Sequence, residues 1–503
     1  MIEIPAPIAS VIDQAIEQVY SFEPLVAKTV ILVPDVLKAQ VAVAADAIGM
    51  DVETVSYVLG LLVCYPLGII MSQIPYGMPR HAFSFLLGAF LLQFTLGVQW
   101  IHQLISSLVA YAMIVILPRK SLKTVLPLFA MLYLTMGHLH RQYVNYLGWD
   151  LDFTGCQMVL TQKLYMIAYN LYDGELLAKG VDDRAAKKCS SFALKDTPNI
   201  LEFLGYTFCF SNLLAGPATE FMVYERACDG SIFKMSDGTY KKPNNFFATL
   251  RPFIESFIGM GMFLFLGGKF PLLNPSDPQN GTPAILTEEF LKRPFLVRYF
   301  HAWMGLLGVR QKYYFGWKNA EGAQNIWYAG FEGWNDKGEA IGWETSSNVD
   351  VLGFELASNV QDMSKNWNKK TSLWLTRYVY MRTGGSLLAV YSMSAFWHGF
   401  YPGYYIFFLS VPIATLCDRL AKKKITPLIS PSSAFYQVYG MMGTLATTVT
   451  VNYMILPFVL LAGTWAIEAY TSFYYFGHIG CVIFYAVVSC LKTPKKQDKK
   501  KVA

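Results

Sequence analysis

The sequence predicts an all-α polytopic integral membrane protein, on three observations. Of its 503 residues, 54% are hydrophobic and only 15% are charged, which is too much apolar surface for one soluble core and too little charge to solvate it. Uncharged stretches long enough to cross a hydrocarbon core as helix, which takes ~20 residues, recur along the chain. The alternating segments of a membrane barrel do not recur, so helices remain the way to satisfy the backbone in lipid.

The apolar stretches, taken in order, predict roughly ten or eleven membrane helices. The strong stretches are 54–79, 82–118, 384–417 and 425–491, and the weaker ones are 124–137, 158–172, 201–214, 256–268 and 296–308. Polar residues between Gln99 and Gln103 divide the second stretch into two short helices. Glu468 is the single charged residue of the stretch 425–491, which has room for two spans joined by a turn near 462–466.

The two ends of the chain differ from this apolar body, which we assign to residues 51–491. Acidic residues recur among apolar ones in the first 50 residues, without the basic start of a cleaved signal peptide, and this predicts amphipathic helices at the membrane interface. Residues 492–503 form a basic tail. The eight cysteines are scattered, with no CxxC pair and no metal-ligand spacing, so we expect reduced core residues and no metal site.

Basic residues indicate the orientation of the chain. They cluster at 119–123, 419–424 and 492–501, and the positive-inside bias places these segments, and the C-terminus, in the cytosol. The chain ends Lys500-Lys501-Val502-Ala503, the form of a dilysine signal that retrieves membrane proteins to the endoplasmic reticulum. The alternative is a solvated, lipid-attracted tail without an address. No basic surface suited to nucleic acid is apparent.

The stretch 394–405 carries the most chemical information. It places His398 inside an apolar run that has no other ionisable charge, and a histidine within the membrane is a functional candidate. Pro402-Gly403 should break the helix just past it, and Gly399 removes bulk beside it. A histidine in apolar surroundings, with an ordinary pKa of ~6.5, is neutral near pH 7 and can take a proton from a hydroxyl.

Asn368 is the best candidate partner, because a neutral amide can donate a hydrogen bond to a developing oxyanion without bringing a charge into the pocket. The alternative for this pair is structural: His398 as a core histidine bonded to a neighbouring helix, and Asn368 as a loop cap. The chain has six further histidines, so the presence of a histidine alone is weak evidence for a catalytic role.

A family resemblance distinguishes these alternatives. The pattern Trp-His-Gly-x-x-Pro-Gly-Tyr at 397–404 resembles the signature of the membrane-bound O-acyltransferases, specifically their lysophospholipid acyltransferase branch. Further matching segments follow the order of that branch over roughly residues 55–480: 137–139, 172–174, 214–217, 313–317, 321–322, 330–334, 348–350, 366–368 and 374–380. Two departures are Glu344 after Trp343, where the branch has Asp, and Tyr475 in place of Phe in the segment 470–478.

The resemblance implies an enzyme that transfers a fatty acyl group from acyl-CoA to the free hydroxyl of a lysophospholipid, in a chamber enclosed by the membrane helices and by short re-entrant or interfacial helices. It implies that His398 and Asn368 are catalytic, and that acyl-CoA is a co-substrate with no other cofactor. Other acceptors, namely a sterol, diacylglycerol or a protein side chain, stay open, as does a transporter. Head-group preference and oligomeric state are not predicted.

The remaining candidates carry two interpretations each. Trp367, Trp397, Tyr378 and Tyr380 line the acyl tunnel in one interpretation and are packing or interface aromatics in the other. Tyr314 belongs to a matching segment and is a candidate substrate contact. Glu321 and Asp350 either bind the acceptor head group or form salt bridges within the scaffold, with Lys312, Arg310 or Arg377 as expected partners.

Overall fold

The computed structural model confirms the all-α class, and its described residues hold no strand beyond two isolated bridges. The structure describes residues 6–21, 35–148, 150–274, 276, 277, 279, 281–430 and 432–493. The chain forms two compact units. Unit 1 comprises the chain up to residue 263 with 311–349 and 368–400, and unit 2 comprises 264–310, 350–367 and the chain from residue 401.

Unit 1 begins with the two helices that the amphipathic N-terminal segment predicts. They are α1 (Ala6–Ser21) and α3 (Asp35–Ile48), which contact α7 and α4 respectively. The long apolar helix α4 (Val52–Gln73) begins where the side chain of Asp51 accepts a 2.6 Å bond from the N–H of Thr54. The basic tail from residue 494, with its dilysine ending, lies outside the described residues.

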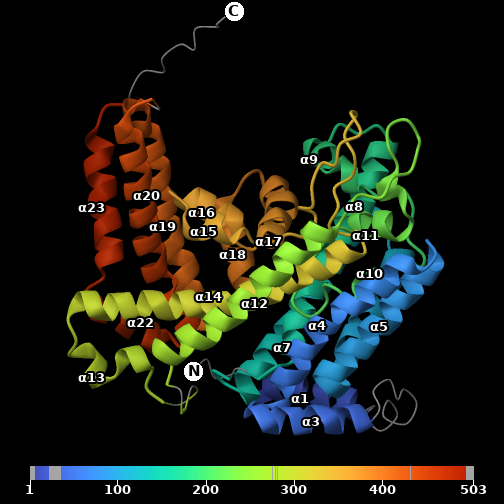
Figure 1. Ribbon diagram of the computed structural model, residues 1–503, viewed down its shortest axis with the longest axis horizontal. Helices are drawn as coiled ribbons and strands as arrows, with labels where there is room; N and C mark the ends of the chain where they lie inside the picture. Colours follow the sequence, from blue (N-terminus) through green and yellow to red (C-terminus); the bar gives the residue numbers. More distant parts are fainter. Residues whose placement is uncertain are drawn as a thin grey trace, which may run out of the picture. The chain divides into compact units, whose positions relative to one another are not determined.

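The predicted division of the second apolar stretch is confirmed. Helix α5 (Met78–Leu96) ends at Gly97, whose φ of 58° suits a residue without a side chain, and α6 (Trp100–Ile116) follows a single 3-10 turn. Helices α7 (Arg119–Val144) and α8 (Phe153–Ala178) then pack side by side (Figure 1). Short helices α9, α10 and α11 complete this part, over Arg184–Lys188, Ile200–Thr207 and Phe221–Cys228.

The rest of unit 1 carries the two segments predicted to react. Helices α12 (Phe246–Lys269) and α14 (Phe295–Ile326) pass from one unit into the other along the chain. Helix α17 (Lys369–Trp374) continues into a π-helical turn (Leu375–Tyr380), and α18 (Leu387–His398) follows.

Unit 2 packs the C-terminal apolar helices on each other. Its shorter helices α13, α15, α16, α21 and α22 span Glu288–Leu291, Val351–Glu355, Val360–Asn366, Leu456–Leu460 and Gly463–Ser472. The helices α19 (Pro402–Lys424), α20 (Ala434–Met454) and α23 (Phe476–Cys490) lie side by side in Figure 1, coloured orange to red. Helix α21 ends just before Leu461, whose φ is 63°, beside the predicted turn.

Six helices of the described residues are long and apolar enough to cross a membrane, or seven if the bent pair α22 and α23 counts as one span. This is fewer than the ten or eleven that the apolar stretches predict. Helices α8 and α14 are long, but they carry buried cations such as Lys163 and Lys318, which lower their apolar character. The cysteines are all unpaired and, except for Cys490, buried, as expected.

Candidate active site

Asn368 occupies an unusual backbone position in unit 1. It directly precedes α17, and its φ of 44° and ψ of 51° place it in the left-handed region, which asparagine tolerates better than most residues. Its side chain makes no capping bond to the helix. The loop-cap interpretation of Asn368 is therefore wrong for the side chain, although the residue stands at the N-cap position.

A second asparagine holds the side chain of Asn368. Asn348 is buried, and its Oδ1 accepts a 3.0 Å bond from the backbone N–H of Lys370, which leaves its Nδ2 as a donor. That Nδ2 donates to Oδ1 of Asn368 at 3.1 Å. Because Oδ1 of Asn368 is used as the acceptor, the N–H groups of its Nδ2 are presented on the other side of the amide.

Charged groups hold the same two segments together. The carbonyl of Asn348 accepts a 2.8 Å bond from the N–H of Lys369, whose Nζ pairs with the carboxylate of Glu344. The Nζ of Lys370 donates to the carbonyl of Glu344 at 2.6 Å. Burial alone would raise the pKa of Glu344, but its bond from Lys369 and the charges of both lysines lower it. Glu344, one of the two departures from the family pattern, thus stabilises the loop around Asn348.

His398 is the last residue of α18, and the predicted break of the helix behind it is confirmed. Gly399 follows with a φ of 112°, and α19 begins at Pro402. The carbonyl of Trp397 accepts a 3.1 Å bond from Nε2 of His138 on α7, so Nε2 carries the proton of that ring. A Cβ on Gly399 would lie 3.1 Å from Cγ of His138. The space that Gly399 leaves is therefore filled by the ring of His138.

One apolar cluster supports both segments that are predicted to react. Trp374, at the end of α17, and Trp397, beside His398, are buried in the same cluster, with ring centroids 6.1 Å apart. The indole Nε1 of Trp397 donates to the carbonyl of Met158 at 3.0 Å, and Gln162 donates to Thr371 at 2.9 Å. Helix α8 thus anchors the helix that follows Asn368 and the helix that ends at His398.

The hydroxyl of Tyr378 belongs to a buried polar network. It lies 2.9 Å from both carboxylate oxygens of Glu220 and 2.7 Å from Oδ1 of Asn170. Arg377 pairs with Glu220 at 3.0 Å. Burial raises the pKa of Glu220, and the charge of Arg377 opposes that shift. The network fixes the π-helical turn on α8 and α11, and a substrate contact by the Tyr378 ring stays a prediction.

The other predicted contacts are placed as follows. Glu321 pairs with Lys318 at 3.1 Å, and Lys318 also pairs with Glu255 at 3.0 Å. The salt-bridge interpretation of Glu321 holds, but Lys312, Arg310 and Arg377 were the wrong partners. Asp350 caps α15 by accepting a bond from the N–H of Gly353.

Two of the aromatic residues predicted to contact substrate, Tyr314 and Trp367, are placed by packing contacts. Tyr314 is buried on α14, close to Gly259 of α12. Trp367 belongs to unit 2, where its ring packs on Phe354 with centroids 5.0 Å apart. Their roles as substrate contacts stay predictions.

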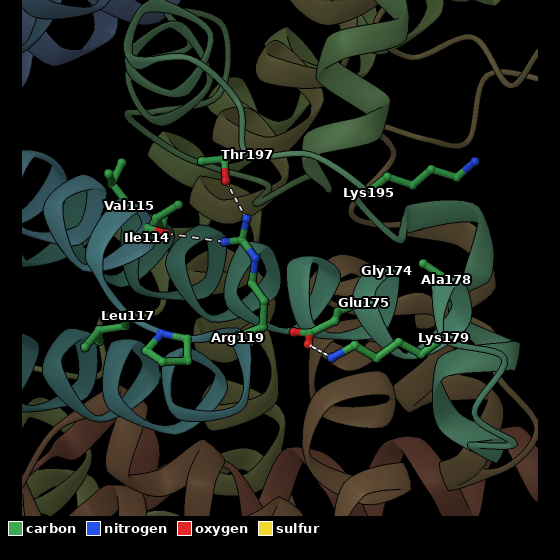
Figure 2. Close-up of a pocket in the computed structure, with 11 residues that line it drawn as sticks. Ile114, Val115, Leu117, Arg119, Gly174, Glu175, Ala178, Lys179, Lys195 and Thr197 are labelled. Carbon is green, nitrogen blue, oxygen red and sulfur yellow. Dashed lines mark hydrogen bonds and ion pairs between the residues drawn. The ribbon is translucent and has the colours of Figure 1, made fainter.

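A pocket of about 560 Å³ opens at the ends of α6 and α8 in unit 1, shown in Figure 2. Its walls combine apolar groups such as Ile114 with cations, but two of these cations are already engaged. Arg119 donates to Thr197 and to the carbonyl of Ile114, and Lys179 pairs with Glu175. Neither His398 nor Asn368 lines this pocket.

Sequence reasoning gave no role to several residues that shape the site. Asn348 stood within a matching segment, and its signal was a second asparagine shortly before Asn368. His138 also stood in a matching segment. Asn170 and Glu220 carried no signal of their own, because only the fold brings them to Tyr378.

Comparisons with known proteins identify the family of the chain. A family profile described as MBOAT, membrane-bound O-acyltransferase family, matches residues 104–445. Membrane-bound glycerophospholipid O-acyltransferase 2 of Gallus gallus is 29% identical over 422 residues, which are 83% of this chain and 80% of the relative. Lysophospholipid acyltransferase 2 of Arabidopsis thaliana is 30% identical over 456 residues, 86% of this chain and 93% of the relative. Lysophospholipid acyltransferase of Schizosaccharomyces pombe is 27% identical over 473 residues, which are 90% of this chain and 89% of the relative.

Proposed function

This chain belongs to the membrane-bound O-acyltransferase family, and from that premise we propose that it transfers a fatty acyl group from acyl-CoA to the free hydroxyl of a lysophospholipid. The names of its relatives, which are lysophospholipid and glycerophospholipid acyltransferases, support the choice of acceptor. The transfer uses acyl-CoA as a co-substrate and needs no other cofactor.

The observation that carries the mechanism is the orientation of Asn368. The bond from Asn348 consumes Oδ1 of Asn368 and leaves Nδ2 as a donor. A preorganised neutral donor is what a developing oxyanion requires, and such a donor lowers the activation barrier by ~2.7–4 kcal/mol. The shared cluster of Trp374 and Trp397 supports a role for His398 in the same site.

The proposed reaction is a direct transfer between the two substrates. Neutral His398 takes the proton of the lysophospholipid hydroxyl as its oxygen attacks the thioester carbonyl, and Nδ2 of Asn368 donates to the oxyanion that forms. The intermediate then collapses, the carbon–sulfur bond breaks, and the imidazolium of His398 returns its proton to the departing CoA thiolate. No covalent enzyme intermediate is needed.

The cellular setting is part of the proposal. We place the protein in the endoplasmic reticulum membrane with its C-terminus in the cytosol, where the dilysine ending can be read. The interfacial segment 1–50 precedes the catalytic domain 51–491, and the basic tail 492–503 follows it. Acyl-CoA approaches from the cytosol and the lysophospholipid from the bilayer.

The test is acyl-CoA-dependent conversion of a lysophospholipid panel by membranes that contain the wild type, His398→Ala or Asn368→Ala at matched protein levels. His140→Ala is the matched control, because His140 lies on α7 and no role in the reaction is assigned to it. We expect product from the wild type and the control, and a loss of roughly 100-fold or more in the two site variants.

Two outcomes contradict the proposal in different ways. Normal turnover by a well-folded His398→Ala variant would contradict the role of His398 as the general base. Wild-type membranes that acylate a sterol, diacylglycerol or a peptide but no lysophospholipid would change the acceptor, and flux of a substrate without transfer would indicate a transporter.

A further inference from the structure

Three potential metal ligands meet in unit 1, on elements that take no part in the proposed reaction. His81 lies on α5, Glu202 on α10 and Glu225 on α11, and one ligand atom from each lies within 4.8 Å of the others. We propose that this cluster binds a divalent transition-metal ion, with Zn²⁺ the best match for one imidazole and two carboxylates. Sequence spacing predicted no metal site, because the ligands come from three separate helices.

The separation of the ligand atoms supports an ion between them. Nε2 of His81 lies 3.6 Å from Oε2 of Glu225, which is longer than the ~2.7–3.2 Å of an N–H···O hydrogen bond. Two ligand atoms each ~2.0–2.2 Å from a tetrahedral Zn²⁺ are roughly 3.4 Å apart. The gap therefore suits an ion bound by both atoms better than a direct bond between them.

The imidazole of His81 is held from its other side. Its Nδ1 lies 3.0 Å from the hydroxyl of Tyr224, and both residues are buried, with 1% and 2% of their surface exposed. A Cβ on Gly205 would lie 2.3 Å from that hydroxyl and 2.8 Å from the carbonyl of His81, so the packing leaves little freedom. Metal-binding histidines are commonly fixed in this way through the nitrogen that does not bind the metal.

Both carboxylates are placed to accept a cation. Oε2 of Glu225 is buried and accepts no hydrogen bond from the described residues, which is costly for a carboxylate. Glu202 is held by its capping box, in which Oε2 accepts a 2.8 Å bond from the N–H of Asn199. That bond leaves Oε1 of Glu202 for the ion. Asp229 adds a further negative charge near Glu225.

The experiment measures zinc on the full chain, purified in detergent without a histidine tag. The protein is stripped with a chelator and dialysed against Zn²⁺ alone, bound metal is counted by atomic emission, and the affinity is measured against a chromogenic chelator. The variants are Glu225→Gln and Glu202→Gln. Glu202→Gln can retain the capping box of α10, because a glutamine at this position can also accept the bond from the backbone N–H of the N-cap residue. Glu289→Gln, at an exposed glutamate of α13, is the matched control.

We expect about one Zn²⁺ per chain in the wild type and in Glu289→Gln, and binding roughly tenfold weaker or more in both cluster variants. Zinc should also raise the thermal unfolding midpoint of the stripped wild type and of Glu289→Gln more than that of Glu202→Gln. A stripped wild type that takes up no zinc would overturn the proposal. Wild-type stoichiometry and affinity in folded Glu202→Gln and Glu225→Gln would do the same, because the ion would then bind elsewhere.

Discussion

The substitution Asn348→Asp tests the orientation of Asn368 while leaving Asn368 itself intact. An aspartate can still accept the bond from the N–H of Lys370, now made at 3.0 Å. Its second oxygen would face Oδ1 of Asn368 across a contact of 3.1 Å, where two acceptors repel. The amide of Asn368 therefore turns over and donates its Nδ2 to the introduced carboxylate, so the donor proposed for the oxyanion is withdrawn.

The expected loss follows from the value of one oxyanion donor. Removal of such a donor lowers kcat by ~10²–10³-fold, about 2.7–4 kcal/mol, and we expect a fall of about 100-fold. The KM values should change by less than about threefold, because the donor acts in the transition state. The assay is steady-state acyl transfer in purified, detergent-solubilised protein. Asn244→Asp is the control, since its side chain accepts a bond from the N–H of Phe246 that aspartate keeps.

A double variant separates this positioning role from simple damage. If Asn348 acts through Asn368, then Asn348→Asp combined with Asn368→Ala should be no slower than Asn368→Ala alone. A folded Asn348→Asp protein with kcat within about threefold of the wild type would refute the reasoning, and so would losses in the two single variants that multiply in the double.

Two other substitutions test features next to the site. Gly399→Ala should lower the stability of the protein by ~1–3 kcal/mol, because φ is 112° there and the new Cβ would lie 3.1 Å from Cγ of His138; an unchanged thermal unfolding midpoint would contradict this packing. Glu344→Gln should cost no more than ~1 kcal/mol at pH 7, since the Glu344 side chain is 62% exposed. The pKa of Glu344 is lowered from 4.5 by Lys369 despite burial, so its contribution is present above about pH 4.5 and is lost as pH falls through the lower folded-state pKa. Thermal unfolding midpoints of the wild type and Glu344→Gln should therefore converge in acid, and a difference that grew there would have the wrong sign.

Much of the helical pattern could be predicted from local chemistry. The break at Gly97 followed from polar residues in an apolar stretch, and the break after His398 followed from Pro402 and Gly403. Fewer helices of the described residues are long and apolar enough to cross a membrane than the apolar stretches predict, because buried charges lower the mean hydropathy of some long helices. Helix α8 is one such case, where Lys163 is satisfied by other parts of the chain.

The sequence identifies candidate reacting residues through local signals, but it does not identify the residues that support them. A histidine in an apolar helix and a motif match are local signals, and both segments carrying them meet one apolar cluster. The bond from Asn348 to Asn368 depends on how a loop folds back, and the pairing of Glu220 with Tyr378 joins residues 158 positions apart. Such contacts have no period or spacing in the sequence.

The buried Lys163 has a consequence for how the protein is made. Its Nζ donates to the carbonyl of Tyr206 and to Oδ1 of Asn212, each at 2.8 Å, and these partners lie 43 and 49 residues further along the chain. A lone lysine at the centre of a bilayer helix costs ~2.5–3.5 kcal/mol on insertion scales. Lys163 can therefore make both bonds only after residue 212 has been synthesised. The bonds that offset this cost thus depend on a later part of the chain and cannot form while α8 is the last helix made.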